Sequence, residues 1–366
     1  MSDGVRPPAI VYFALQRMDY PRNHRIRQYL DCELGATIHV IPLSPRRGFL
    51  RHARELVREA RMMSGPVDAV ILAEFSLSFS LFSWLLAKRL HAVHIVDFFV
   101  GPYETHVEDR GAVKPRSFRG LAMRAIEWVA GTSADAILID TDVRRASLVR
   151  RFGKTTITLP VGAPDWAHLS APASHGGKLN MLYYGNYIPL HGLPAFVAGL
   201  AEACASLGDF HLTMIGEGDH RELTQRLVTE SGLTPRVSFL EPVPEEVLAD
   251  HIAASEIIVG IFGTSPKAMS VIANKVWQGL AANRIVVTRD AEALDELRDI
   301  ARERLVVCPN SDARSIAGAI AAAATASRQM SDQDIGPGLE EYVRARYRAL
   351  GAELPLDCRD DAQRKG

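Results

Sequence analysis

Short apolar runs alternate along the chain with longer stretches of helical periodicity. In the first half, six runs rich in β-branched side chains predict strands at Ala9–Phe13, Thr37–Pro42, Ala69–Leu72, His94–Phe98, Ala136–Ile139 and Thr156–Pro160. In the second half, six more predict strands at Met181–Tyr184, His211–Ile215, Val237–Leu240, Ile257–Ile261, Ile285–Thr288 and Leu305–Val307. Strands that alternate with helices are typical of parallel βαβ units. We therefore expect an α/β fold with two Rossmann-like domains.

The segments between these strands carry the helical pattern. They predict helices at Arg46–Met63, Arg119–Gly131, Pro194–Ser206, Glu222–Glu230, Pro244–Ala254, Ala268–Ala282, Asp312–Ala324 and about Leu339–Leu350. The stretch from Ala163 to Lys178 holds prolines and glycines but few aliphatic residues, which indicates a linker. We expect a first domain over residues 1–170, a second over 178–335, and a C-terminal crossover helix and tail over 336–366 that return to the first domain.

Composition narrows the class of protein. With 366 residues, 47% hydrophobic and 23% charged, the chain has the composition of a globular protein with room for large cores. A formal net charge of −1 argues against nucleic acid as a partner. The scattered cysteines Cys32, Cys204, Cys308 and Cys358 favour free thiols in a reducing compartment. No signal-peptide pattern opens the chain, and Phe75–Leu86 is shorter than the roughly 20 residues of a membrane span, so we expect a cytoplasmic protein.

Three glycine-containing loops follow predicted strands of the second half. They read Gly185-Asn186-Tyr187-Ile188-Pro189-Leu190-His191-Gly192, Gly216-Glu217-Gly218 and Ile261-Phe262-Gly263-Thr264-Ser265-Pro266-Lys267. Ligands of parallel sheets bind beyond the carboxyl ends of the strands, and the N-terminus of a following helix attracts anions. Taken singly, each loop is equally compatible with a plain strand-to-helix turn.

The third loop leads into the segment Ser270–Gln278, predicted to be helical. Lys275 and Gln278 are three residues apart there and share one face of the helix. A lysine and an amide on that face could bind a diphosphate and a ribose diol. The alternative is a solvated polar face.

Taken together, the order and spacing of these motifs resemble the donor half of the family 4 glycosyltransferases, which have the GT-B fold. The resemblance runs from Tyr184-Gly185-Asn186 through Asn274-Lys275-Val276-Trp277-Gln278 to Leu280-Ala281. The first half is similar to that family in Asp97-Phe98, Tyr103-Glu104-Thr105, Asp109-Arg110 and Leu159-Pro160-Val161-Gly162-Ala163. The resemblance implies two domains facing a cleft and a retaining enzyme that transfers a sugar from a nucleotide sugar. The donor would bind to the second domain and the acceptor to the first.

The resemblance also implies a set of donor-binding residues. They are Gly185, Asn186, His191, Gly216, Gly218, Phe262, Gly263, Thr264, Ser270, Lys275 and Gln278. The family has a pair of glutamates where this chain has Ser270 and Gln278, and an arginine and a lysine where it has Asn186 and His191. Lys275, Lys267 or the helix dipole would then have to supply the positive charge at the diphosphate.

On the acceptor side the candidates for catalysis are Asp97, Glu104 and His106, with Glu108 in the same predicted loop. One of them could accept the proton of the acceptor hydroxyl. Equally, Asp97 could cap a loop and the others could be solvated. A retaining transfer can also pass the proton to the leaving phosphate, so no side-chain base is required. No zinc pattern occurs, and Asp140-Thr141-Asp142 lies outside the donor loops, so we expect no metal and no cofactor.

Two other functions remain open, a GT-B sugar-nucleotide epimerase and a degenerate GT-B partner subunit without activity of its own. The replaced glutamates and missing cations motivate the second. A Rossmann dehydrogenase is disfavoured because Ala14-Leu15-Gln16-Arg17 follows the first strand in place of a Gly-x-Gly-x-x-Gly motif.

An arginine stripe is predicted on the helix Arg46–Met63. Its members, spaced four, three, four and three apart, are Arg47, Arg51, Arg54, Arg58 and Arg61. Such a face could bind anionic lipid and place the protein at the inner face of the plasma membrane, where a saccharide or lipid-linked acceptor would be used. The alternative is a solvated helix with Glu55 and Glu59 as partners.

Overall fold

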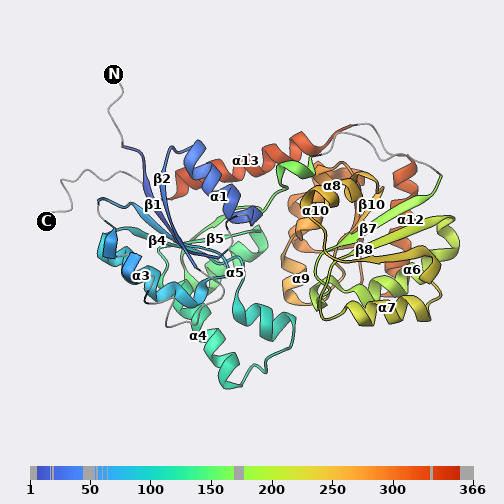
Figure 1. The fold of residues 1–366 in the computed structure, drawn as a ribbon, viewed down its shortest axis with the longest axis horizontal. Helices are drawn as coiled ribbons and strands as arrows, with labels where there is room; N and C mark the ends of the chain where they lie inside the picture. Colours follow the sequence, from blue (N-terminus) through green and yellow to red (C-terminus); the bar gives the residue numbers. More distant parts are fainter. Residues whose placement is uncertain are drawn as a thin grey trace. The chain divides into compact units, whose positions relative to one another are not determined.

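The computed structural model describes residues 6–354 apart from 17, 19, 44–53, 55–56, 60, 64, 169–176 and 330–332. The chain divides into two compact units. The first comprises residues 1–107, 111–161 and 344–366, and the second residues 108–110 and 162–343. In its described part, each unit contains one parallel six-stranded sheet flanked by helices (Figure 1).

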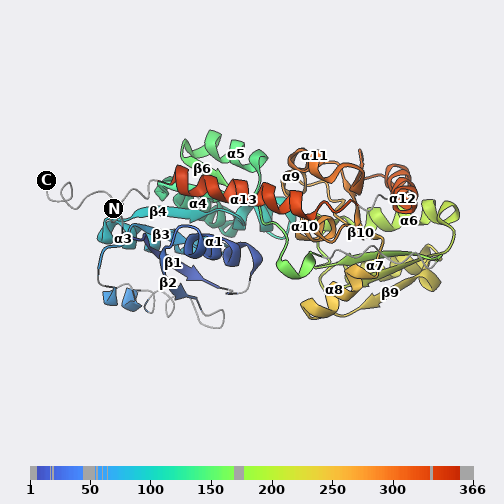
Figure 2. The ribbon, with the colours of Figure 1, turned by 90° about the horizontal axis from the view of Figure 1, so that it is seen from above.

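The first sheet has the strand order β2-β1-β3-β4-β5-β6, and Figure 2 labels β2, β1, β3, β4 and β6. Its strands are β1 (Ala9–Leu15), β2 (Thr37–Pro42), β3 (Ala69–Leu72), β4 (Val93–Asp97), β5 (Ala136–Ile139) and β6 (Thr155–Thr158). Every neighbouring pair is parallel, with Ile10 of β1 between Ile38 of β2 and Ala69 of β3. The six predicted strands of this half are confirmed.

Helices cover both faces of the first sheet. They are α1 (Pro21–Cys32), α3 (Ser80–Leu90), α4 (Phe118–Ser133), α5 (Asp142–Phe152) and the later part of α13 (Gly336–Glu353). Alternate strand residues such as Val11 and Phe13 pack against Leu86 of α3, Ala130 of α4 and Leu148 of α5. On the other face, Tyr347 of α13 contacts Tyr29 of α1.

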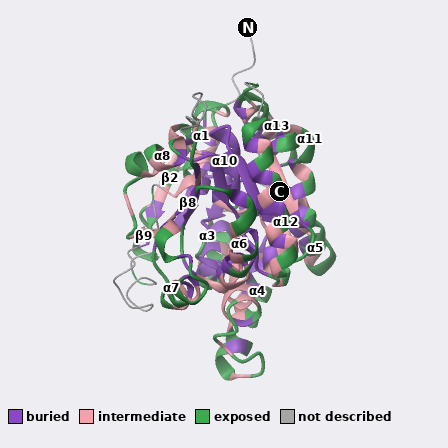
Figure 3. Cartoon of the chain, turned by 90° about the vertical axis from the view of Figure 1, so that its right-hand side faces the viewer, coloured by how far each residue is buried: buried purple, intermediate pink, exposed green. Residues whose placement is uncertain are grey.

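The second sheet has the order β12-β11-β10-β7-β8-β9, again with all neighbours parallel. Its strands are β7 (Leu179–Tyr184), β8 (Phe210–Ile215), β9 (Val237–Leu240), β10 (Ile257–Val259), β11 (Ile285–Arg289) and β12 (Leu305–Cys308). They confirm the predicted strands of the second half. Figure 3 shows how deeply the strands are buried.

Three helices build the core on one face of the second sheet: α6 (Leu193–Leu207), α7 (Arg221–Glu230) and α12 (Ala313–Arg328). The remaining main helices are α8 (Glu245–Ala253), α9 (Pro266–Ser270) and α10 (Asn274–Ala281). The segment Pro189–Leu207 is long and apolar enough to cross a membrane. Its side chains Leu193, Phe196 and Leu200 are nevertheless fully buried in the core, which accounts for its apolar character.

The predicted continuous helix Ala268–Ala282 is wrong. The chain leaves the helix after Ser270, is extended at Val271 (φ −110°, ψ 152°) and at Ala273 (φ −65°, ψ 145°), and becomes helical again at Asn274. The β-branched Val271 and Ile272 favour extended backbone, and Ile272 is buried there. Ser270 is therefore on a different helix from Lys275 and Gln278.

The segment Glu104–Asp109, predicted as a loop, is a π-helical turn. Of the predicted arginine stripe, Arg47 and Arg51 lie outside the described residues, whereas Arg54, Arg58 and Arg61 are exposed in helical backbone. Arg58 pairs with the adjacent Glu59 at 3.0 Å.

Each sheet has one position at which the direction of strand addition reverses. In the first sheet, β1 lies between β2 and β3, so the reversal falls between β1 and β3. In the second sheet it falls between β7 and β10, because β8 and β9 continue on the other side of β7. At such a position the loops at the carboxyl ends diverge and leave a crevice, where ligands of open α/β sheets bind. The loops after β7 and β10 are therefore the expected position of a ligand-binding site in the second unit.

Candidate active site

The loops after β7, β8 and β10 pack backbone against backbone through glycines. A Cβ at Gly216 (φ +134°) would lie 2.1 Å from the carbonyl oxygen of Gly185, and one at Gly263 would lie 2.3 Å from that of Leu190. The amide of Tyr187 donates to Glu217 O at 2.8 Å. Only glycine fits at these approaches, so the three loops form one continuous surface at the reversal of the second sheet.

Lys275 lies in the first turn of α10, beneath this surface. Its side chain is only 4% exposed, and Nζ sits 4.0 Å from the centroid of the Tyr183 ring. Within the described residues Nζ has no hydrogen-bond partner. The ring offers a cation–π contact, but a buried ammonium without an anion is costly. Burial accordingly lowers the pKa of Lys275 well below its usual value.

Gly185 opens a path to that ammonium. The residue is exposed and has a φ of +123°. A Cβ at this position would lie 3.6 Å from Lys275 Nζ and 3.5 Å from His191 Cε1. Because glycine leaves this space unfilled, an atom of a bound ligand can occupy it in contact with both side chains. The chemistry of Nζ favours an anionic atom there.

His191 is buried, and its tautomer is set by two neighbours. Tyr183 Oη lies 2.8 Å from Asn186 O and 2.7 Å from His191 Nδ1. A carbonyl oxygen only accepts, so Tyr183 donates to Asn186 and accepts from Nδ1–H, which leaves Nε2 as an acceptor. Burial and the charge of Lys275 lower the pKa of His191 well below its usual value. A neutral His191 does not replace the family's second cation.

The other predicted donor-binding residues are spread around this point. Gln278 is buried one turn after Lys275 on α10. Phe262 is also buried but stacks on Phe196, with ring centroids 5.3 Å apart, so it packs the core. Ser270 Oγ donates to Lys267 O at 3.2 Å. Three predicted residues lie on the exposed side of the loops: Asn186, Gly218 and Thr264. Sequence reasoning missed Tyr183, although its place at the end of a predicted strand was a signal.

In the first unit, Asp97 ends β4 and is fully buried against Arg22 of α1. Its carboxylate accepts from Arg22 Nε at 2.9 Å and Nη2 at 3.0 Å, and from the amide of Phe99 at 3.2 Å. Arg22 Nη1 donates further to Leu159 O. Burial raises the pKa of Asp97, and the guanidinium opposes that rise. This pairing, which the sequence did not predict, engages both oxygens of the candidate base.

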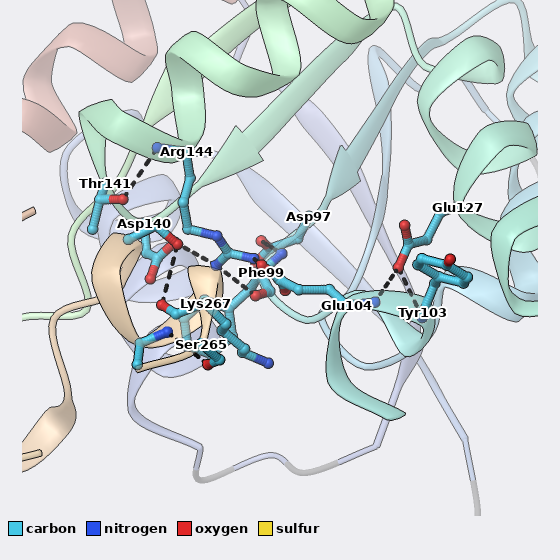
Figure 4. Close-up of polar contacts among 12 residues, drawn as sticks. Asp97, Phe99, Tyr103, Glu104, Glu127, Asp140, Thr141, Arg144, Ser265 and Lys267 are labelled. Carbon is cyan, nitrogen blue, oxygen red and sulfur yellow. Dashed lines mark hydrogen bonds and ion pairs between the residues drawn. The ribbon is translucent and has the colours of Figure 1, made fainter. Parts of the chain in front are cut away.

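Glu104 is held by a second arginine (Figure 4). Arg144 Nη2 donates to its two carboxylate oxygens at 3.0 and 2.8 Å, while Nη1 donates to Asp140 at 2.7 Å and to Phe99 O at 2.9 Å. His106 is half-buried in the same π-helical turn. The predicted catalytic residues thus lie at the carboxyl end of the first sheet, with Asp97 and Glu104 each bound to an arginine.

Glu74 follows β3, at the reversal of the first sheet, and was not predicted. It is fully buried, and Oε1 accepts from Asn23 Nδ2 at 2.7 Å. Oε2 has no hydrogen-bond partner in the part of the chain that the structure describes. Burial, and then the charge of Asp97, raise the pKa of Glu74 to about 7. The next residue, Phe75, has a φ of +62°, so the turn stores backbone strain.

The described ranges contain no group of three or more His, Cys, Asp or Glu side chains that could hold a metal ion. Beside the loops of the second sheet, Lys275 of α10 contributes a buried ammonium, and Arg289 at the end of β11 donates to Gly263 O at 2.7 Å.

Sequence comparison finds a family that matches most of the second unit. Residues 178–325 match the family described as glycosyl transferases group 1. This segment is similar to the group 1 glycosyltransferases. The predicted resemblance to family 4 glycosyltransferases is confirmed. No curated protein matches the chain.

Solved glycosyltransferase structures share the whole fold. Sucrose-phosphate synthase from Thermosynechococcus elongatus superposes with a TM-score of 0.67 at 16% identity, covering 94% of this chain and 98% of that chain. Anabaena HepE in complex with UDP and glucose gives 0.66 at 11% identity, covering 94% and 98%. The lipopolysaccharide outer core galactosyltransferase WaaB gives 0.63 at 12% identity, covering 94% and 100%. The predicted GT-B fold is confirmed, and family and fold together support glycosyl transfer.

Proposed function

We propose that the chain transfers a sugar from a nucleotide-sugar donor to a saccharide or lipid-linked acceptor, with retention of configuration and without a metal. One observation carries the proposal: a buried ammonium, that of Lys275, faces the open position at Gly185 and has no partner among the described residues. A diphosphate bound there would supply the missing anion. HepE, which shares the fold, was solved with UDP and glucose, and this supports a nucleotide sugar as the ligand.

The remaining donor contacts follow from the same geometry. Gln278, one turn after Lys275, is placed to bond the ribose hydroxyls. His191 Nε2, as an acceptor, would bond a hydroxyl of the sugar or a protonated phosphate oxygen. Lys275 neutralises charge on the leaving diphosphate, which is the role that a metal fills in other transferases.

Proton transfer in this proposal does not require a carboxylate base. Arg22 bonds both carboxylate oxygens of Asp97, and Arg144 bonds both of Glu104, so the arginines occupy the oxygens that a base would use. A retaining transfer can pass the acceptor proton to an oxygen of the leaving diphosphate. We therefore assign Asp97 and Glu104 a structural role at the carboxyl end of the first sheet. Of the predicted catalytic residues, His106 remains the candidate for contact with the acceptor.

Replacing Lys275 tests the proposal. Lys275→Ala should weaken the binding of UDP, GDP, ADP or CMP sugars, whichever binds, at least tenfold, or about 1.4 kcal/mol. Calorimetry measures the affinity, and Lys178→Ala, which removes an exposed lysine of the same unit, is the control. Because binding an anion raises the pKa of Lys275, wild type should also take up protons on binding and lose affinity as the pH rises. If a folded Lys275→Ala protein bound the donor with unchanged affinity, the donor diphosphate would not bind at Lys275.

Product analysis tests the chemistry. We expect transfer that persists in EDTA and a product with the donor's anomeric configuration, measured by NMR. Slow donor hydrolysis without acceptor would mark an enzyme, whereas binding without hydrolysis or transfer would favour the degenerate partner subunit. An interconverted donor sugar would indicate the epimerase.

The place of action remains a proposal as well. We place the protein in the cytoplasm, acting at the inner face of the plasma membrane. On the arginine stripe, Arg54, Arg58 and Arg61 are exposed, but the pairing of Arg58 with Glu59 weakens its attraction for lipid.

A further inference from the structure

Helix α4 is apolar on the face that it presents to solvent. Its inner face buries Gly120, Ala130 and Gly131, whereas Phe118 is 88% exposed, Leu121 54% and Trp128 55%. At about 100° per residue, the exposed apolar residues of α4 fall within an arc of about 120°, in which Thr132 is the exposed polar residue. The apolar residues are Phe118, Leu121, Ala122, Ala125, Trp128 and Val129. A surface helix of a soluble protein normally carries polar residues on this face, so α4 lacks the usual amphipathic arrangement.

The neighbouring helix α3 extends this surface. It packs against α4 within the first unit (Figure 1) and exposes Leu81 and Leu85, one turn apart and each 51% exposed. Large apolar side chains scattered singly on a surface need no explanation, but six on two helices that pack against each other form a patch. We call the outward face of α3 and α4 the apolar platform. It comprises Leu81, Leu85, Phe118, Leu121, Ala122, Ala125, Trp128 and Val129.

Basic residues border the apolar platform. Arg119 and Arg124 lie on opposite sides of the apolar arc of α4, and Lys114 and Arg116 precede the helix; all four are exposed. The acidic residue of α4, Glu127, faces inward and pairs with Arg151 at 3.2 Å. The border of the platform is thus positive although the chain as a whole is close to neutral, with a net charge of −1.

We propose that the apolar platform docks on an anionic phospholipid surface. α4 would lie in the plane of the interface, with Phe118, Leu121 and Trp128 at the boundary between headgroups and acyl chains. Arg119 and Arg124 would contact lipid phosphates on either side. An in-plane helix with Trp, Phe and Leu inserted and arginines at its margins has the composition that binds anionic interfaces. The docking is independent of the transfer reaction proposed above.

A second copy of the chain fits the platform less well. In a two-fold interface the same patch meets itself, so the arginine borders of both copies would come together. The centre of a protein interface is also depleted of charge, and the arginines immediately flank this one. An anionic lipid surface complements both the apolar centre and the positive border.

Vesicle co-sedimentation of the full chain tests the proposal. Wild type should bind vesicles of phosphatidylcholine with phosphatidylglycerol, bind pure phosphatidylcholine at least tenfold more weakly, and lose affinity as salt is added. Phe118→Gln with Leu121→Gln should weaken binding to the mixed vesicles at least tenfold, and Arg119→Gln with Arg124→Gln at least threefold. Val247→Gln, at an exposed valine of α8 in the other unit, should bind like wild type. Arg54→Gln with Arg58→Gln, on the arginine stripe, should also bind like wild type.

Fluorescence locates the contact. The chain has four tryptophans, and a blue shift on adding anionic vesicles should disappear in Trp128→Phe while sedimentation persists. Wild type that stays in the supernatant at low salt overturns the proposal, as does equal binding to neutral and anionic vesicles. Ultracentrifugation that shows a dimer dispersed by Phe118→Gln with Leu121→Gln, without vesicle binding, would make the platform an interface between copies. Nucleotide affinity, measured without vesicles, should be unchanged in all these variants and reports on the donor site separately.

Discussion

Both sheets are parallel and have one reversal in the direction of strand addition, but the buried cations at their carboxyl ends differ in how they are paired. At the first sheet the buried cations Arg22 and Arg144 are matched by carboxylates at 2.7–2.9 Å. At the second sheet the buried cation Lys275 has no such partner in the described chain, and glycine leaves the space above it open. A paired network needs no ligand to satisfy its charges. An unpaired buried charge carries a cost that an anionic ligand relieves, so it indicates where the ligand binds.

The largest effect on stability should come from breaking an ion pair at the carboxyl end of the first sheet. Arg22→Met leaves the buried carboxylate of Asp97 without its counter-ion and should lower the free energy of unfolding by about 3–5 kcal/mol. Adding Asp97→Leu should restore much of that loss, because no charge is then left unpaired. Urea denaturation measures both. Arg221→Met, which breaks a more exposed pair with Glu241, should cost no more than about 1 kcal/mol. Equal losses in the two single variants would contradict a structural role for the Arg22–Asp97 pair.

A second test concerns Glu74, the exception on the paired side. Its pKa is raised to about 7 in the folded protein, so the folded state binds more protons than the unfolded state between about pH 4.5 and 7. Stability from this group is present below pH 4.5 and is lost as the pH rises to 7. Glu74→Gln should therefore stabilise the protein at pH 8 by about 3 kcal/mol and flatten the decline above pH 4.5.

The control for this test is Glu222→Gln, at an exposed position, which should leave the pH profile unchanged. Thermal and urea unfolding from pH 4 to pH 9 measure both variants. If the free energy of unfolding of Glu74→Gln varied with pH in the same way as that of wild type, Glu74 would be ionised over the whole range, with water or a cation at Oε2.

The smallest effect, a change in the donor KM, should come from replacing Gln278, which lies one turn after the unpaired Lys275. Gln278→Ala removes a neutral hydrogen bond to the donor and should raise the donor KM about three- to tenfold with little change in kcat. Gln278→Glu should keep activity, because the family has glutamate there and a carboxylate accepts well from ribose hydroxyls. Steady-state kinetics measure both variants. An inactive but folded Gln278→Glu protein would mean that α10 is not aligned with the family's helix as we assume.

The strands could be predicted from sequence because buried parallel strands are nearly continuous apolar runs. Helix α1 was not predicted, since the segment Pro21–Cys32 is mostly polar and buries Arg22 and Asn23 beside its few apolar side chains. The break between α9 and α10 was also missed, because Val271 and Ile272 fit an apolar helix face as well as an extended segment. Periodicity does not separate the two in so short a stretch.

The candidate site was predictable as a set of residues but not as an arrangement. Lys275 could be singled out from its spacing to Gln278. Its surroundings could not, because the neighbours of Nζ are the ring of Tyr183 and the backbone of Gly185, which are distant in the sequence and offer no anion. Glu74 stands directly after a predicted strand, but its unpaired oxygen results from a fold that brings it against Asn23, 51 residues away in sequence. The identity of a buried charge is local information, whereas its pairing is set by the tertiary structure.

The interlocked glycine loops have a consequence for the thermodynamics of binding. Tyr187 bonds to Glu217, and Phe262 bonds to His191, so loops from three different strands hold one another in place before any ligand arrives. Little backbone freedom remains to be lost when a nucleotide binds, and the entropic penalty of ordering these loops has already been met during folding. Association should then proceed without a slow ordering step on this side, and the affinity should respond to the chemistry of the ligand more than to the flexibility of the loops that receive it.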